Sequence, residues 1–444
     1  MKTPIYDFVK KYAERGPSRF HMPGHKGKSF LGCESLDITE ISGADTLYSA
    51  DGIIEESENN ATRLFGSAHT FYSAEGSTLA IKAMIALAVS GRKKGERPVV
   101  MAARNAHKSF VYACALLDID VIWLYSDDTD SLCSARISAE EIENALKAGE
   151  KPDAVYITSP DYLGNIADVR GISTVCRAHG IPLLVDNAHG AYLRFLSPSQ
   201  HPISLGADMC CDSAHKTLPV LTGGAYLHVS KIANSDYLSS ARNMLSVFAS
   251  TSPSYLILES LDLCNKYLAG NYEDRLSETV IRLNRLKSRL ADAGFEVLEC
   301  EPLKLVIKIS KFGYTGYDAA EILRDKNIEI EFFDGEYTVF MITPENTEED
   351  FERLEAALLT FKRKEALDES FIPLVRGVKR MSIRDAVFSK KETVAVECAI
   401  GRISAAPTVS CPPAIPIAVS GEMITREAAE LFKKYNIADV EVVK

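Results

Sequence analysis

The sequence predicts an α/β fold whose large domain holds a mostly parallel sheet, followed by a smaller α+β domain. Between residues 78 and 230, short apolar runs alternate with helical patterns, which is typical of β-α-β units. The runs are almost continuously apolar, as in strands that helices cover on both faces. Near residue 250 the pattern changes to long helices and a few strands, which indicates a second domain.

The individual elements follow from these patterns. In the large domain we expect strands at residues 98–103, 120–126, 153–160, 181–190, 207–216 and 223–230, and helices at 78–90, 108–118 and 171–180. In the second domain we expect helices within 254–292, around 317–327 and at 347–365, and strands within 295–310, 328–335 and 337–344. The chain should therefore divide into an N-terminal arm (1–58), a large domain (59–250), a small α+β domain (251–365) and a C-terminal tail domain (366–444).

Charge and cysteine usage narrow the class of protein. The formal net charge of −11 disfavours nucleic acid as a partner, because a phosphate backbone is repelled by an acidic surface. The ten cysteines form no C-x-x-C pair, so we expect no metal site of the zinc-ribbon kind. The sequence shows neither an export signal nor an apolar run long enough to span a membrane, and we expect a cytoplasmic protein.

A lysine stands directly after an expected strand in residues 213–224, SAHKTLPVLTGG. A lysine that forms a Schiff base must be held at a fixed point and partly desolvated, so that its amine is neutral and nucleophilic. Lys216 meets these conditions, and Ser213 and His215 beside it are able to hydrogen-bond a phosphate. Taken alone, the pattern also fits an ordinary surface lysine.

A second group of polar residues ends the strand VDNAHG (185–190). A carboxylate at Asp186 is placed to pair with the nitrogen of a pyridine ring and keep it protonated, and His189 is able to approach the same ring. The alternative is a strand-end aspartate that caps the next helix.

Three further features complete the constellation. Gly76, Ser77 and Thr78 open a helix whose free N–H groups would bind a phosphate, unless Ser77 is simply an N-cap. His107 follows a strand, where its ring would stack on a planar cofactor or cap the next helix. Thr158 ends a third strand.

The order of phosphate loop, histidine, aspartate and lysine matches pyridoxal-phosphate (PLP) enzymes of fold type I, the aspartate-aminotransferase-like class.

At finer grain the chain resembles the prokaryotic Orn/Lys/Arg decarboxylase family, in its short form without the N-terminal domain of the large inducible enzymes. The resemblance is carried by HMPGHKG (21–27), DITEISGADTLYSADGII (37–54), RNAHKS (104–109), VDNAHGA (185–191), SAHKTL (213–218) and GRISAAPTVSCPPAIPIAVSGE (401–422). It implies a decarboxylase that converts arginine, lysine or ornithine to the corresponding amine of polyamine biosynthesis, with PLP as cofactor. It also implies a homodimer or higher homo-oligomer.

The resemblance assigns roles to the residues that match its motifs. Lys216 would be the Schiff-base lysine, Asp186 the partner of the ring nitrogen, and His107 the stacking residue. His189 lies in the D-x-x-H pattern of the family. The phosphate contacts would come from Ser77, Thr78, Ser213 and His215, and Thr158 would approach the ring hydroxyl.

Three positions depart from the family pattern: Glu75 beside the phosphate loop, Cys411 where an aromatic residue is common, and Ala414 where glycine is usual. They leave open a degenerate homologue with a regulatory role. An aminotransferase or another PLP lyase also stays open, because Arg376, Arg380 and Arg384 are late arginines of the kind that bind a substrate carboxylate.

The distal cation of a basic substrate requires a counter-charge. Glu40, Asp45 and Asp51 in the N-terminal segment are the candidates. Each of them is also readily explained as a solvated loop acid.

Overall fold

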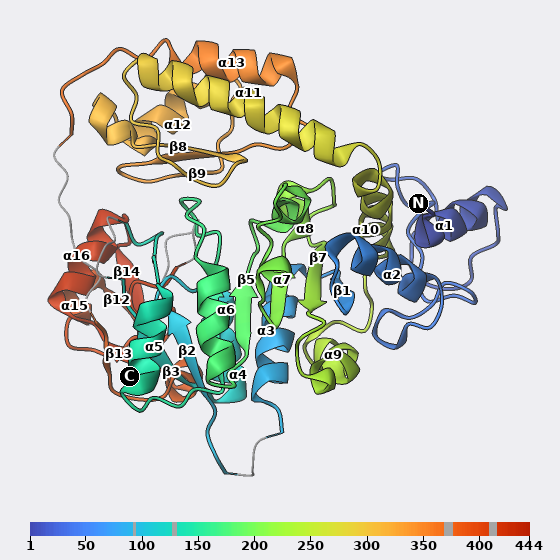
Figure 1. Cartoon of the computed structure of the whole chain (residues 1–444), viewed down its shortest axis with the longest axis horizontal. Coiled ribbons are helices and arrows are strands. Elements are labelled where there is room, and N and C mark those ends of the chain that lie inside the picture. The colour runs from blue at the N-terminus through green and yellow to red at the C-terminus, as the bar shows by residue number, and fades with distance from the viewer. Residues whose placement is uncertain (92–94, 127–130, 368–375, 408–414) are drawn as a thin grey trace. The chain divides into compact units, whose positions relative to one another are not determined.

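The structure, a computed structural model, describes residues 1–91, 95–126, 131–367, 376–407 and 415–444. A seven-stranded sheet has the strand order β1-β7-β6-β5-β4-β2-β3 (Figure 1). Its strands are β1 (His69–Ser73), β2 (Val99–Ala103), β3 (Asp120–Leu124), β4 (Ala154–Thr158), β5 (Leu183–Asp186), β6 (Met209–Asp212) and β7 (Ala225–Val229).

Most of this sheet is parallel, as the sequence predicted. β2 pairs with β3 and β5 pairs with β6 in parallel register. Helices connect successive strands, since a parallel neighbour is reached only by a crossover. β7 instead pairs antiparallel with both β6 and β1. β1 was not predicted, because its sequence HTFYS has no continuous apolar run.

The helices of this region are α3 (Gly76–Val89), α4 (Lys108–Leu117), α5 (Ala139–Lys147), α6 (Val169–Ala178), α7 (Pro202–Leu205), α8 (Ala214–Thr217) and α9 (Ser235–Phe248). α3 has apolar residues on every side, and its Leu79, Ile81 and Met84 are at most 3% exposed. A helix that is apolar all round must be covered on all sides, which explains its burial against the sheet.

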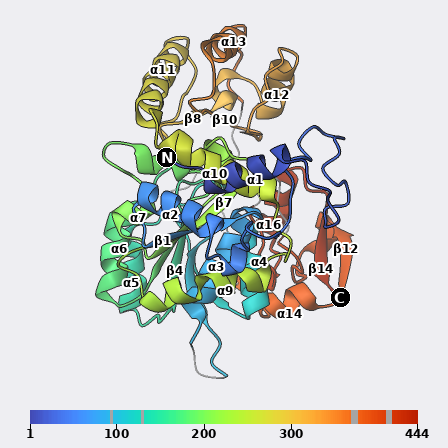
Figure 2. The same cartoon turned by 90° about the vertical axis from the view of Figure 1, so that its right-hand side faces the viewer.

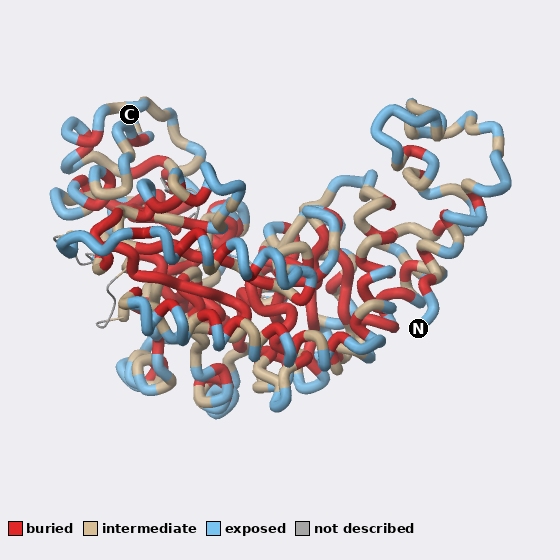
Figure 3. Tube along the Cα trace, turned by 90° about the horizontal axis from the view of Figure 1, so that it is seen from above, coloured by how far each residue is buried: buried red, intermediate tan, exposed pale blue. Residues whose placement is uncertain are grey.

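The chain forms two compact units, which we describe separately. The first comprises Met1–Arg92, Asp153–Tyr156 and Val169–Asp274, and the second comprises Lys93–Pro152, Ile157–Asp168 and Arg275–Lys444. Buried stretches, red in Figure 3, run through the interior of the chain, and exposed stretches lie along its outer turns and loops. The four-part domain division expected from the sequence stays a prediction.

The first unit is tied together at its N-terminus. Helices α1 (Pro4–Glu14), α2 (Ile53–Phe65) and α10 (Tyr255–Leu268) lie together (Figure 2). The carboxylate of Asp262 in α10 accepts the N–H groups of Ile5 and Tyr6 at 2.9 and 3.0 Å, and the hydroxyl of Ser57 in α2 at 2.6 Å. One buried aspartate therefore links the three helices.

The second unit contains the predicted α+β part. Its antiparallel sheet has the order β8-β10-β9, and helices α11, α12 and α13 lie beside it (Figures 1 and 2). The bounds are β8 (Lys304–Ile307), β9 (Phe332–Phe333), β10 (Thr338–Met341), α11 (Tyr272–Asp292), α12 (Gly316–Arg324) and α13 (Glu348–Leu358). The second of these strands and the last of these helices are shorter than the sequence predicted.

In the C-terminal part of the second unit, residues 376–407 and 415–444 form two short strand pairs and three helices. β11 (Val378–Lys379) pairs with β13 (Glu422–Met423), and β12 (Lys391–Ala395) pairs with β14 (Asp439–Val443). The helices are α14 (Ile383–Phe388), α15 (Val396–Ala399) and α16 (Arg426–Lys434). Among the described residues, none of the helices is both long enough and apolar enough to cross a bilayer.

Candidate active site

Lys216 lies on the one-turn helix α8 directly after β6, whereas the sequence analysis placed it at the end of a strand. Its Nζ is 2.8 Å from Nε2 of His189. An amine donates in such a pair and the imidazole nitrogen accepts. The contact therefore fixes the lysine amine and brings together two residues that the sequence predicted for one site.

Asp186 ends β5 and is 2% exposed. It accepts the hydroxyl of Tyr156 at 3.0 Å, the N–H of Ala188 at 3.2 Å and the thiol of Cys211 at 3.7 Å. Burial raises the pKa of this carboxyl despite those hydrogen bonds and the nearby charge of Lys216. A cation bound next to Asp186 would reverse that shift, and the protonated nitrogen of a pyridine ring is such a cation.

The predicted phosphate loop meets the lysine helix. Ser213 donates its hydroxyl to the hydroxyl of Ser77 at 2.8 Å, and Thr78 follows in the first turn of α3. The helix begins at Gly76, so Ser77 is not its N-cap. The N–H of Gly76 donates to the carbonyl of Gly223 at 2.7 Å, so this N–H already has a hydrogen-bond partner within the chain.

His215 and Glu75 border the same loop. His215 donates from Nδ1 to the carbonyl of Gly224 at 2.9 Å, and burial lowers the pKa of its imidazole, which is therefore mostly neutral at pH 7. The exposed Glu75 accepts the N–H of Ser250 at 2.7 Å. That contact holds the carboxylate of Glu75.

A buried network of Asp212, His201, His228 and Asn187 supports the turn that carries Asp186. Both histidines donate from Nε2 to one oxygen of Asp212 at 3.0 Å, and Asn187 donates to the other at 2.7 Å. Although burial alone would raise the pKa of Asp212, the two imidazoles hold it well below its usual value. The sequence analysis missed these residues, although polar side chains within apolar strands were the available signal.

His201, Cys210, Asp212 and His228 also have the composition of a metal site, since their ligand atoms lie within 4.8 Å of one another. The N–H of Ile203 points at Nδ1 of His201 at 3.4 Å, which places the imidazole proton on Nε2. A metal ligand must lose that proton. The hydrogen-bond network therefore accounts for this cluster.

The second unit contains the two other predicted residues, His107 and Thr158. His107 is the N-cap of α4 and accepts the N–H of Ser109 at Nδ1, at 3.1 Å, which leaves the ring proton on Nε2. Thr158 ends β4, and its buried hydroxyl has no hydrogen-bond partner. Asn105, which the sequence analysis did not single out, has neither amide atom hydrogen-bonded although it is 3% exposed.

Arg104 anchors the connection between β2 and α4. Its guanidinium donates to the carbonyls of Pro416 and Ile417 at 2.7 and 3.0 Å and pairs with Glu422 at 3.5 Å. It also lies over the ring of Trp123, 5.2 Å from the centroid. These contacts fix the stretch that carries Asn105 and His107.

Two of the late arginines that left an aminotransferase open have other contacts. Arg384 donates to the carbonyls of Ala115 and Leu116 at 3.1 and 3.0 Å. Arg376 lies over the ring of Tyr125, 5.6 Å from the centroid.

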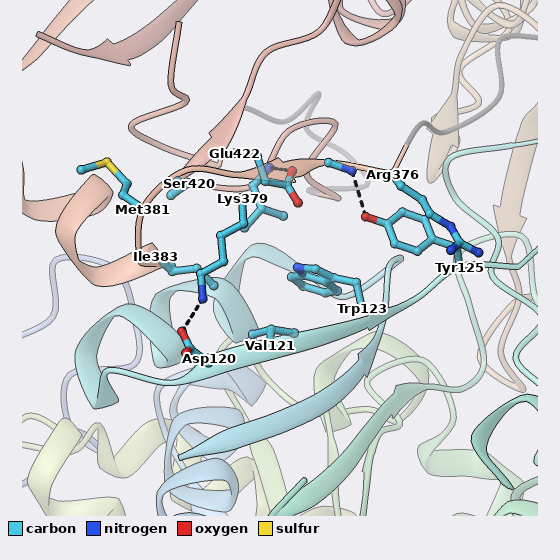
Figure 4. A pocket seen from close by; sticks show the side chains of 13 residues that line it. Asp120, Val121, Trp123, Tyr125, Arg376, Lys379, Met381, Ile383, Ser420 and Glu422 are labelled. Atoms are coloured by element: carbon cyan, nitrogen blue, oxygen red, sulfur yellow. Dashed lines mark hydrogen bonds and ion pairs between the residues drawn. The ribbon is translucent and has the colours of Figure 1, made fainter. Parts of the chain in front are cut away.

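The ring of Tyr125 lines a cavity of about 300 Å³ in the second unit (Figure 4). Arg376 and Lys379 border this cavity as well, and Lys379 is paired with Asp120 at 2.6 Å. Both arginine contacts above lie within the second unit, and neither of them is to a carboxylate.

Of the acids expected to bind a distal cation, Asp45 is committed to the backbone. Its carboxylate accepts four N–H groups, those of Thr46, Asp51, Gly52 and Ile54, at 2.8 to 3.2 Å. Glu40 and Asp51 are exposed.

The sequence was then compared with known families. The profile described as "Orn/Lys/Arg decarboxylase, major domain" matches residues 3–300, and the one described as "Orn/Lys/Arg decarboxylase, C-terminal domain" matches residues 371–438. The chain belongs to the Orn/Lys/Arg decarboxylase family. The predicted resemblance is confirmed, the enzyme is an amino-acid decarboxylase, and the family implies PLP as its cofactor.

Relatives match along almost the whole chain. The arginine decarboxylase of Bacillus subtilis (strain 168) is 33% identical, over 96% of this chain and 92% of its own length. The arginine decarboxylase of Halalkalibacterium halodurans is 32% identical, over 99% of this chain and 95% of its own length. A Bacillus subtilis protein named "Uncharacterized protein YaaO" is 32% identical, over 97% and 93%.

Solved structures confirm the fold class. The lysine decarboxylase of Francisella novicida superposes with a TM-score of 0.82 at 17% identity, covering 100% of this chain and 81% of that one. The constitutive lysine decarboxylase of E. coli gives a TM-score of 0.80 at 18% identity, covering 100% of this chain and 82% of that one. At this identity the likeness concerns the fold alone.

Proposed function

We propose that this enzyme uses PLP to decarboxylate a basic amino acid, arginine, lysine or ornithine, to the corresponding amine and CO₂. The observation that carries the proposal is the pairing of Lys216 with His189, in the same unit as the buried Asp186. Arginine is the first substrate to test, because relatives that match almost the whole chain are named arginine decarboxylases.

PLP supplies an electron sink for the pair of electrons that the Cα–carboxylate bond leaves behind. Asp186 would hold the ring nitrogen protonated. The raised pKa of the carboxyl supports this role, because burial disfavours its charge until a cation is present. Lys216 would carry the cofactor, and its amine or the imidazole of His189 would return the proton to Cα.

The remaining roles follow the family pattern. The phosphate would be held by Ser77, Thr78, Ser213 and His215, of which Ser77 and Ser213 already share a hydrogen bond. His107 would stack on the ring, and Thr158 would donate to the ring hydroxyl. The unpartnered Thr158 hydroxyl supports its role, because a buried polar group without a partner is costly.

We further propose a cytoplasmic homodimer in which the N-terminal segment acts as an arm. Phe20, Phe30 and Leu31 are 96%, 78% and 89% exposed. Large apolar side chains at such exposure are typical of a surface that another chain covers. Glu40 and Asp51, exposed in the same segment, remain the candidates for the distal cation of the substrate.

Two alternatives make different predictions. An aminotransferase would yield a keto acid, and another PLP lyase would yield other products. A degenerate regulatory homologue would bind no PLP as a Schiff base. Cys411 and Ala414, two of the departures behind the second alternative, lie outside the described residues.

The test is to incubate the purified protein and PLP with arginine, lysine and ornithine separately. Mass spectrometry would detect agmatine, cadaverine and putrescine. We expect one amine to dominate and to vanish in Lys216→Ala, whereas Lys231→Ala, at an exposed lysine after β7, should retain the activity. A visible Schiff base with no amine from any of the three substrates would refute the proposed reaction.

A further inference from the structure

We infer that Asn105 is a cofactor-binding residue of this enzyme and that its side-chain amide hydrogen-bonds the polar edge of bound PLP. The inference rests on the proposed function, since it assumes PLP at the site that contains His107 and Thr158. It adds a residue to which neither the family pattern nor the motif analysis gave a role.

The starting point is a side chain with no hydrogen bond in a place where water is scarce. Asn105 is 3% exposed, and both its Oδ1 and its Nδ2 lack a partner. An asparagine amide offers two donors and an acceptor with two lone pairs. Leaving such a group buried and unpaired costs roughly 1–3 kcal/mol, so each one requires an explanation, and a ligand that completes its hydrogen bonds is one.

The position of Asn105 favours a ligand. It follows β2, and Thr158 ends β4, and these two strands are neighbours in the sheet. Helical crossovers connect β2, β3 and β4 in sequence, so the strands run parallel and their carboxyl ends share one edge. Ligands of open α/β sheets bind at that edge.

Thr158 also lacks a hydrogen-bond partner for its hydroxyl. Asn105 and Thr158 thus place two unpaired polar groups at the ends of adjacent strands in the second unit. A ligand that carries oxygen or nitrogen atoms along one edge would satisfy both residues, and the PLP ring has such an edge at its phenolic oxygen.

The backbone around Asn105 is held in place by contacts that do not involve a ligand. Arg104, the preceding residue, is bound by the carbonyls of Pro416 and Ile417. His107, two residues further, is fixed as the N-cap of α4. The unpaired amide therefore sits on a rigid stretch, and preorganisation of this kind is expected of a binding group.

The test uses Asn105→Leu, which keeps the approximate volume and removes the polar groups. Without PLP, we expect the melting temperature to rise by about 1–2 °C, because an unpaired amide is no longer buried. With PLP, we expect the dissociation constant, measured from the Schiff-base absorption, to rise about tenfold. Asn105→Asp, which replaces a donor with a negative acceptor, should weaken PLP binding at least as much.

Asn265→Leu is the matched control. Asn265 is fully buried in α10, but its Nδ2 donates to the carbonyl of Ser57 and to the hydroxyl of Tyr72 at 3.0 and 2.7 Å. This substitution should lower the melting temperature of the PLP-free protein and leave the PLP dissociation constant unchanged. The melting temperature of the PLP-free protein should therefore rise in Asn105→Leu and fall in Asn265→Leu. This difference distinguishes a binding residue from a structural one.

The outcomes separate this inference from the proposed function. If the wild-type protein binds PLP and Asn105→Leu binds it within twofold, the inference is overturned and the proposed function stands. A lower melting temperature of PLP-free Asn105→Leu also overturns it, because the amide would then stabilise the fold itself. Wild-type protein that takes up no PLP at all overturns both.

Discussion

Replacing Glu259 with glutamine should stabilise this protein, and the gain should grow with pH. Glu259 lies in α10, is 4% exposed, and its Oε1 has no hydrogen-bond partner. Burial, and then the charges of Asp37 and Asp262, raise the pKa of its carboxyl from the usual 4.5 to about 8. Asp37 is itself paired with His25 at 3.1 Å, and Asp262 binds α1 and α2.

The sign of the effect follows from proton binding. Below about pH 4 the carboxyl is protonated in both the folded and the unfolded chain and has no differential effect. As the pH rises, the unfolded chain releases the proton while the folded chain keeps it until about pH 8. The free energy of unfolding therefore falls with rising pH. At 1.36 kcal/mol per pH unit, the loss is about 3 kcal/mol at pH 7 and at most about 5 kcal/mol above pH 8.

Glutamine cannot ionise, so Glu259→Gln escapes this loss. Scanning calorimetry or urea unfolding at pH 5, 7 and 8.5 would compare the variant with the wild type, and Glu352→Gln at an exposed position of α13 is the control. We expect a small gain at pH 5 and the largest gain at pH 8.5. A gain that is the same at all three values, or one that shrinks with pH, would show that the reasoning about Glu259 is wrong.

Three other substitutions test the support of the site. In Gly190→Ala the new Cβ would lie 2.1 Å from Oδ1 of Asn187. The free energy of unfolding, measured with urea, should therefore fall by about 1–3 kcal/mol. The affinity for PLP, measured by absorption titration, should fall as well. Asp212→Ala should cost about 3–5 kcal/mol, because it leaves the N–H groups of His201, His228 and Asn187 buried without their acceptor, and an unchanged unfolding midpoint would contradict the network. Arg104→Met removes the hydrogen bonds to the carbonyls of Pro416 and Ile417. The segment around these two residues should then be cleaved by proteases while the remainder of the chain resists, as mass mapping of the fragments would show.

The sequence by itself determined the fold class and the family, and it predicted the site residues. Apolar runs alternating with helical patterns specified a mainly parallel sheet, because such strands must be covered on both faces. Lys216, Asp186 and His189 were singled out as candidates because polar residues at strand ends stand out against apolar runs. The family followed from motifs distributed over nearly the whole chain.

Only the tertiary structure decided which polar groups are hydrogen-bonded and which residues are their partners. Asp45 looked like a ligand for a cation until its carboxylate proved to bind four backbone N–H groups. Glu75 was only a departure from the family pattern until the structure showed that it accepts the N–H of Ser250. Asn105 looked unremarkable until burial and the absence of partners marked it. Sequence patterns report which face of an element is apolar, whereas hydrogen bonds join residues far apart in the chain, so their pairing is set only by the packed fold.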